Sequence, residues 1–143
     1  MSYLKAIPDN FAELLENAES FEVWVFNPNL RNKRFGFKSE YIEFQANQIN
    51  KNIDDAIKKN LVSAILRDIK KGGQIARCWI PHHGIRAIYD NQIIELAFCY
   101  MCHSFRGQIA DKKIYGSIPQ EKNCKSKNIF EEIIANGLNY SNL

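Results

Sequence analysis

Thiol and imidazole side chains, which are preferred protein ligands of Zn²⁺, are concentrated in residues 78–103. Three of the four cysteines and all three histidines of the chain lie in this stretch: Cys78, His82, His83, Cys99, Cys102 and His103. The spacing Cys78-x4-His83-x15-Cys99-x2-Cys102 matches two ligand pairs that a fold brings together around a structural ion. It predicts a zinc site formed by Cys78, His83, Cys99 and Cys102.

The same cysteines are open to other interpretations. Cys99 and Cys102 fall in or beside an expected strand, where residues three apart point to opposite faces. The residues between them, Tyr100 and Met101, are not typical of a turn. On this interpretation the cysteines are small buried core residues. A disulfide is a third interpretation, which a reducing cytosol disfavours. The run from Cys99 to His103 also fits the attachment pattern of c-type haem, which requires export.

A cysteine beside a histidine provides a nucleophile and its base. Cys99 or Cys102 with His83 therefore makes a cysteine-dependent hydrolase one alternative. The sequence marks no third orienting residue, no paired metal-binding carboxylates near these histidines and no glycine-rich phosphate loop. We therefore predict no catalytic or cofactor-binding residues, and a protein that is not an enzyme.

The charge of the chain is mildly basic and unevenly distributed. The formal net charge is +3, yet residues 1–22 carry five acidic side chains and one basic side chain. We expect Glu13, Glu16 and Glu19 to be rim charges that face a basic protein partner, whereas the basic remainder would suit an acidic one. Basic and aromatic residues intermingle in residues 31–37, as in proteins that stack single-stranded nucleic acid. The mild net charge argues against a nucleic-acid partner.

Hydrophobic periodicity predicts three helices and a set of antiparallel strands. Helical spacing follows a cap at Asn10 and recurs over residues 53–69, where Gly72 ends the helix. A third helix is expected over residues 128–136, with Asn128 and Glu131 as a capping box. Alternating patterns predict strands at residues 21–26, 41–44, 74–80, 84–89, 93–100, 105–110 and 113–118. The predicted fold class is α+β: an antiparallel sheet meander with about three helices packed on it, in a single domain, residues 1–143.

Length and composition agree with this class. A chain of 143 residues with 45% hydrophobic and 24% charged residues suits one globular domain. The apolar runs are far shorter than the roughly 20 residues that span a bilayer, and the first residues lack the pattern of a secretory signal. We expect a cytoplasmic protein without a membrane partner.

Two segments of the C-terminal half form a recognisable pattern: residues 78–86 read CWIPHHGIR and residues 96–102 read LAFCYMC. They resemble a group of small uncharacterised bacterial proteins with a C-x-x-P-[R/H]-H-x-[I/L]-R stretch followed by C-[F/Y]-x-C. The resemblance covers residues 76–138 and implies no activity. It implies a shared structural feature formed by Cys78, Pro81, His83, Cys99 and Cys102. His82 stands where that pattern usually has arginine, which weakens a catalytic role for this position.

In overall format the chain is similar to the immunity proteins that protect bacteria from polymorphic or contact-dependent toxins. These are small cytosolic α+β proteins without catalytic motifs, so the similarity implies a function by binding alone. The leading hypothesis is a non-enzymatic protein-binding module, an immunity or antitoxin protein that neutralises a cognate toxin. The alternatives are a small zinc-stabilised domain with a nucleic-acid target and a cysteine-dependent hydrolase. The leading hypothesis needs no cofactor, and the first alternative needs zinc.

Overall fold

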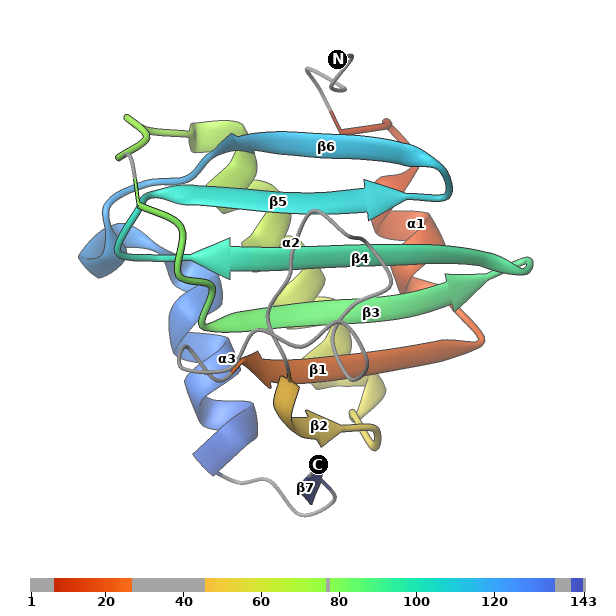
Figure 1. Ribbon diagram of the computed structural model, residues 1–143. Coiled ribbons are helices and arrows are strands. Elements are labelled where there is room, and N and C mark those ends of the chain that lie inside the picture. Colours follow the sequence, from red (N-terminus) through yellow and green to blue (C-terminus); the bar gives the residue numbers. More distant parts are fainter. Residues whose placement is uncertain (1–6, 27–45, 77, 136–139, 143) are drawn as a thin grey trace.

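The computed structural model describes residues 7–26, 46–76, 78–135 and 140–142. The elements, labelled in Figure 1 apart from the short 3₁₀ turn η1, follow in this order: α1 (Phe11–Glu16), β1 (Ser20–Phe26), β2 (Ala46–Asn50), α2 (Asp55–Lys71), β3 (His83–Tyr89), β4 (Gln92–Cys99), β5 (Ser104–Ile109), β6 (Lys112–Ser117), η1 (Glu121–Asn123), α3 (Lys125–Ala135) and β7 (Tyr140–Asn142). The described part of the chain therefore holds runs of consecutive strands separated by helices.

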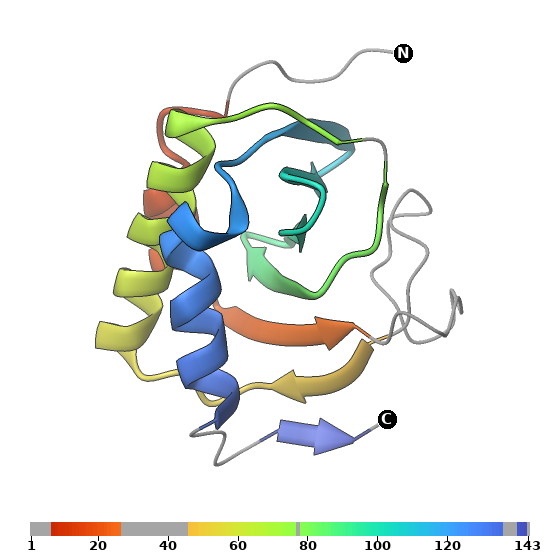
Figure 2. The same cartoon turned by 90° about the vertical axis from the view of Figure 1, so that its left-hand side faces the viewer.

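The strands form one sheet in the order β6-β5-β4-β3-β1-β2-β7. Every neighbouring pair is antiparallel. The meander from β3 to β6 is built from hairpins, and the first of them turns through Asp90 and Asn91, both at positive φ. All three helices pack against the same face of the sheet (Figure 2). The predicted α+β class with an antiparallel sheet is confirmed.

Side chains alternate between the two faces of each strand, and the larger core lies on the face that carries the helices. The strands contribute Val23, Ile85, Leu96 and Phe98 to this core, among others. The helices contribute Phe11, Leu15, Leu61, Val62, Ile65 and Phe130. On the opposite face a smaller cluster contains Trp24, Phe26, Ile49 and Ala97, with Trp79 packed against it. Both faces of the sheet therefore bury apolar side chains.

The long helix α2 overlaps the predicted helix at residues 53–69 and begins two residues later, at Asp55. The Asp54 carboxylate accepts a hydrogen bond from the Ala56 amide at 2.8 Å, which caps the first turn. Gly72 ends the helix at a φ of +63°, a value that a residue without a Cβ adopts at little cost. The predicted stop at Gly72 is confirmed.

The two other predicted helix caps differ from the structure, although Asn10 does stand at the N-cap of α1. Asn10 makes no side-chain capping hydrogen bond. Asn128 lies inside α3, which begins three residues earlier, at Lys125. Its cap comes from α2, because the Asp68 carboxylate accepts hydrogen bonds from the amides of Lys125 and Ser126 at 3.1 and 2.8 Å. A cap supplied by a distant segment leaves no local signal in the sequence.

The predicted strand at residues 74–80 is also wrong. Residues 72–76 and 78–82, called the crossing segment below, pass from the end of α2 over the β6 edge of the sheet to the face opposite to the helices (Figures 1 and 2). They form no strand because both edges of β3 are already paired, with β1 and with β4. The predicted strand at residues 41–44 lies outside the described residues. β2 and β7 were not predicted.

Candidate metal centre

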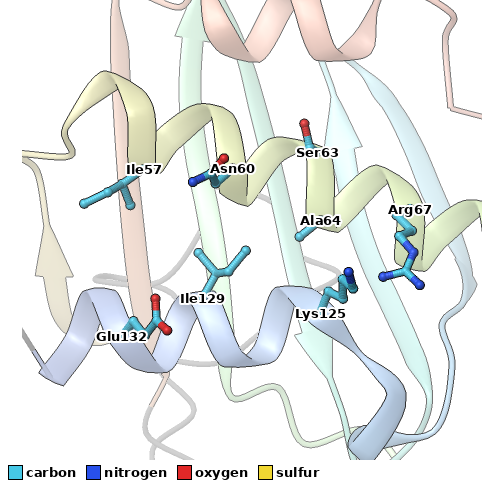
Figure 3. A pocket seen from close by; sticks show the side chains of 8 residues that line it. All are labelled: Ile57, Asn60, Ser63, Ala64, Arg67, Lys125, Ile129 and Glu132. Atoms are coloured by element: carbon cyan, nitrogen blue, oxygen red, sulfur yellow. The ribbon is translucent and has the colours of Figure 1, made fainter.

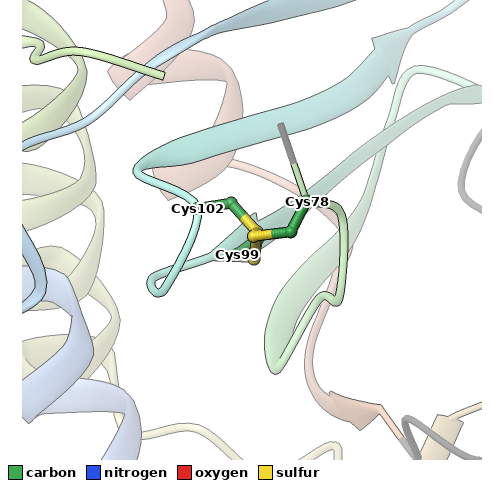
Figure 4. A group of neighbouring side chains, drawn as sticks. All are labelled: Cys78, Cys99 and Cys102. Atoms are coloured by element: carbon green, nitrogen blue, oxygen red, sulfur yellow. A yellow bond between two sulfur atoms is a disulfide. The ribbon is translucent and has the colours of Figure 1, made fainter. Parts of the chain in front are cut away.

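Three cysteine side chains meet on the face of the sheet that carries no helix (Figure 4). Cys78 belongs to the crossing segment, Cys99 ends β4, and Cys102 lies in the turn between β4 and β5. Their Sγ atoms all lie within 4.8 Å of one another. Cys78 and Cys102 are joined as a disulfide, and the Sγ atom of Cys99 contacts that of Cys102. We call these three residues the cysteine cluster.

A tight turn brings the two nearest cysteines together. The Cys102 amide donates to the Cys99 carbonyl at 3.2 Å, and His103 has a φ of +55°. The chain reverses here, so that the Cα atoms of Cys99 and Cys102 are 5.2 Å apart. The expectation that Tyr100 and Met101 would not form a turn is wrong, because both lie in the turn and His103 supplies the positive φ at its end.

The crossing segment is fixed over this turn by backbone hydrogen bonds. The Ala76 amide donates to the Cys102 carbonyl at 2.9 Å, and the Ile80 amide donates to Cys99 Sγ at 3.4 Å. Between them, Trp79 packs on the smaller cluster, and the Arg106 guanidinium lies 4.3 Å from the centre of its indole ring. Sequence reasoning missed these contacts, because backbone amides and a ring under a distant arginine form no motif.

The three sulfurs have unequal access to solvent. Cys99 and Cys102 are fully buried, whereas Cys78 is exposed. An amide that donates to a sulfur stabilises its thiolate form, and thiolates are the form that binds metal. The cluster therefore presents two buried sulfur donors behind one accessible donor.

His83 does not join the three cysteines. It pairs across the strands with Phe98, whose side chain lies in the main core beneath the helices, whereas Cys99 is the next residue of β4 and points to the other face. The imidazole stacks on the Phe130 ring, with the ring centres 5.3 Å apart. Among the described residues, the metal-ligating group contains the three cysteines only. The metal site predicted from the spacing stays a prediction, and three of its four residues lie together in this structure.

Burial determines the protonation of the two neighbouring histidines. Desolvation, reinforced by the adjacent His82, lowers the pKa of His83 to about 4. Desolvation also lowers the pKa of His82, against the attraction of Glu121. His83 is thus a neutral, half-buried residue on the helix-covered face of the sheet, and the Cys–His pair on which a hydrolase would depend does not form with it. The third histidine, His103, lies with its Nδ1 atom 3.0 Å from the Gln74 carbonyl.

The fourth cysteine is separate from the cluster. Cys124 is buried at the start of α3, and its thiol donates to the Pro119 carbonyl at 3.2 Å. Desolvation, together with the nearby Asp68, raises the pKa of Cys124 to about 12. This thiol is therefore protonated and inert at neutral pH.

The acidic residues predicted to bind a partner lie on and just after α1. Glu13 is exposed and Glu16 is half-buried. The carboxylate of Glu19 accepts a hydrogen bond from the Asp90 amide at 3.0 Å, so it also holds the β3–β4 turn. A role for Glu13, Glu16 and Glu19 in binding stays a prediction.

A groove between α2 and α3 was not foreseen (Figure 3). It has a volume of about 320 Å³ and is open to solvent. Its apolar part is formed by Ile57, Ala64 and Ile129. Arg67 and Lys125 lie toward one end, and Glu132 lies toward the other.

Comparison of the chain with protein-family models, with curated protein sequences and with solved structures finds no match. In the described part of the chain, no helix is both long enough and apolar enough to cross a bilayer. The similarity to bacterial immunity proteins therefore stays a prediction.

Proposed function

We propose that this protein is a small zinc-stabilised binding domain, in which Cys78, Cys99 and Cys102 hold the ion as thiolates. The observation that supports the proposal is the convergence of three sulfurs from separate segments to within 4.8 Å of one another. Core cysteines that serve only as small apolar residues have no reason to converge in this way.

The chemistry of the donor set fits zinc. Three sulfurs bound to one Zn²⁺ at about 2.3 Å, with tetrahedral angles, lie roughly 3.8 Å from one another. The three sulfurs lie within 4.8 Å of one another, and the Cys78–Cys102 disulfide must be reduced before all three can bind the ion as thiolates. The three thiolates leave one position of the ion for water or another ligand on the exposed side, beside Cys78.

The ion would fix the crossing segment to the sheet. Cys78 is the ligand from the crossing segment, and Cys99 and Cys102 are the ligands from the β4–β5 turn. Without a bond between the sulfurs, the exposed residues 73–76 and 78 are held by single hydrogen bonds, such as those that the Gly73 and Ala76 amides donate. A structural metal adds its binding free energy to folding, because the unfolded chain offers no preformed site.

The test is the zinc content of the reduced full-length protein, purified without added metal. We expect about one equivalent for the wild type and for Cys124→Ser, which keeps a hydroxyl donor toward Pro119. We expect less than about a tenth of that for Cys99→Ser and Cys102→Ser, because two thiolates bind zinc weakly. Equal zinc content in Cys102→Ser and Cys124→Ser would contradict the proposal.

A second function, the neutralisation of a toxin by direct binding, is favoured by exposed apolar side chains around the cysteine cluster. Ile75 and Ile80 of the crossing segment are each 37% exposed, and Met101 in the β4–β5 turn is 54% exposed. Apolar side chains of this kind act as anchors when a partner buries them. On this proposal the zinc site shapes a surface that a partner protein covers.

The experiment pairs the purified chain with the product of the neighbouring upstream gene, in a binding assay and a toxicity-rescue assay. Ile80→Asp and Met101→Asp should abolish both binding and rescue. Ile57→Asp is the matched control, because Ile57 is 43% exposed on α2, away from the cluster. If the wild type neither binds nor rescues, or if Ile57→Asp is as damaging as the other two, this function is excluded.

A further inference from the structure

We propose that Cys78 is a modification site: its thiolate reacts with a small disulfide such as oxidised glutathione, and Cys102 resolves the resulting mixed disulfide. The reaction requires only reduced thiols and no bound metal, so it goes beyond the zinc proposal and does not depend on it.

The positions of the three thiols assign these roles. Cys78 is exposed, so a small disulfide can reach it from solvent. Cys99 and Cys102 are fully buried, so neither can be the first thiol to react with the small disulfide. The Cα atoms of Cys78 and Cys102 are 5.5 Å apart, within the usual range for a disulfide. An accessible thiol beside a buried partner is the arrangement of a redox-sensitive cysteine with a resolving cysteine.

The chemistry balances without any further reactant. The Cys78 thiolate attacks one sulfur of the small disulfide, forms a mixed disulfide and releases one thiolate of the reagent. The Cys102 thiolate then attacks Cys78 Sγ, forms the Cys78–Cys102 disulfide and releases the second thiolate. Two cysteines are oxidised, and one molecule of the small disulfide is reduced to two thiols. Cys99 does not react and keeps its thiol. It stays beside the new disulfide, because its Cα atom is 5.2 Å from that of Cys102.

The test treats the reduced full-length protein with oxidised glutathione and follows the products by mass spectrometry. The wild type should gain a Cys78–Cys102 disulfide and keep no glutathione. Cys102→Ser should accumulate glutathione on Cys78, because the resolving thiol is gone. Cys78→Ser should react at least about tenfold more slowly than the wild type, because the remaining cluster thiols are buried. Cys99→Ser is the matched control and should still form the disulfide.

Other outcomes overturn the inference. These are a lasting adduct on the wild type, first modification at Cys99, and equal rates for the wild type and Cys78→Ser. Cys124 is an internal control for folding, because its buried thiol is modified only if a variant unfolds. If glutathione is found on Cys124 of a serine variant, that variant has unfolded, and the same cysteine is changed to alanine instead and measured again.

A parallel measurement of released zinc separates this inference from the proposed function. Disulfide formation without any release of zinc contradicts the zinc site and leaves the modification site standing. Bound zinc together with an unreactive Cys78 contradicts the modification site and leaves the zinc site standing.

Discussion

At the scale of single residues, the half-buried His83 stands out for the environment of its Nδ1 atom. His83 Nδ1 is buried, and the described part of the chain offers it no hydrogen-bond partner. The ring nevertheless stacks on Phe130 and lies 6.1 Å from Tyr100, centre to centre. Such a site favours the neutral imidazole, because its charged form would lose solvation in the core.

This environment predicts a loss of stability in mild acid. In the unfolded chain the imidazole titrates near its ordinary pKa of 6.5, and in the folded protein near about 4. Between these values the unfolded chain binds more protons, so the stabilisation is complete above pH 6.5 and is lost as the pH falls toward 4. We expect His83 to contribute on the order of 2–3 kcal/mol to this decline in the free energy of unfolding.

The measurement is urea unfolding from pH 7.5 to pH 4 for the wild type and His83→Phe. Phenylalanine keeps the stacked ring and removes the titrating group, so its stability should vary less with pH over this range. The residual slope should come from the remaining groups, including His82, whose pKa burial also lowers. Parallel pH profiles for the two proteins would show that His83 is not the group responsible.

At the scale of elements, one carboxylate connects the two longest helices. Asp68 of α2 is 2% exposed and accepts hydrogen bonds from two amides and one hydroxyl at the start of α3. Ser126 extends this network, since its hydroxyl also lies 2.8 Å from the Tyr100 hydroxyl. Buried polar groups in such a network depend on every partner, because a missing one leaves the others unsatisfied.

We therefore expect Asp68→Ala to lower the free energy of unfolding by about 3 kcal/mol. Asp54→Ala is the matched control, because Asp54 caps α2 with a single exposed hydrogen bond and should cost about 1 kcal/mol. Denaturant titrations of both variants measure the difference. Equal losses would show that the buried network adds no more than an ordinary helix cap.

The elements that the sequence predicts correctly are those with a local signal. The strands of the meander follow an alternation of period two, and α2 has its cap and its glycine stop within its own segment. The elements that were predicted wrongly depend on contacts with residues far away in the sequence. The crossing segment has a strand-like sequence, but β3, the strand that follows it, already pairs with β1 and β4, and the start of α3 depends on Asp68.

The same distinction applies to the candidate site. Cys78, Cys99 and Cys102 were singled out by residue type and spacing; the β4–β5 turn joins Cys99 to Cys102, and the crossing segment brings Cys78 to them. His83 was included because spacing alone does not give the face of the sheet on which a side chain lies. The face follows only from the register with β4, where His83 is opposite Phe98.

At the scale of the whole molecule, the sheet is enclosed differently on its two faces. Three helices cover one face, and the crossing segment covers part of the other (Figure 2). The helix face is secured by the large core, whereas the crossing segment relies on Trp79, single hydrogen bonds and the cysteine cluster. Metal bound at the cysteine cluster would thus stabilise the crossing segment, which has fewer contacts with the sheet than the helices have.

We expect a zinc chelator to lower the melting temperature of the reduced wild type. A ligand present at 100 times its Kd stabilises a protein by about 2.7 kcal/mol. For a chain of this size that corresponds to a shift of roughly 5–10 °C. Cys102→Ser should melt at the same temperature with and without chelator, as measured by differential scanning calorimetry. An unchanged wild-type melting temperature would show that zinc does not contribute to folding.

The position of β1 in the sheet has a consequence for biosynthesis. This strand pairs with β3, and Ser20 is opposite Ile88, so β1 leaves the ribosome long before its partner exists. Meanwhile Phe21 and Val23, which are buried in the finished sheet, lack the strand that will cover one side of their backbone. Pairings between distant parts of a chain form slowly, and unpaired apolar strands aggregate. Nascent chains stalled before β3 should therefore be substrates for chaperones, whereas chains released after β4 can close the sheet around β1.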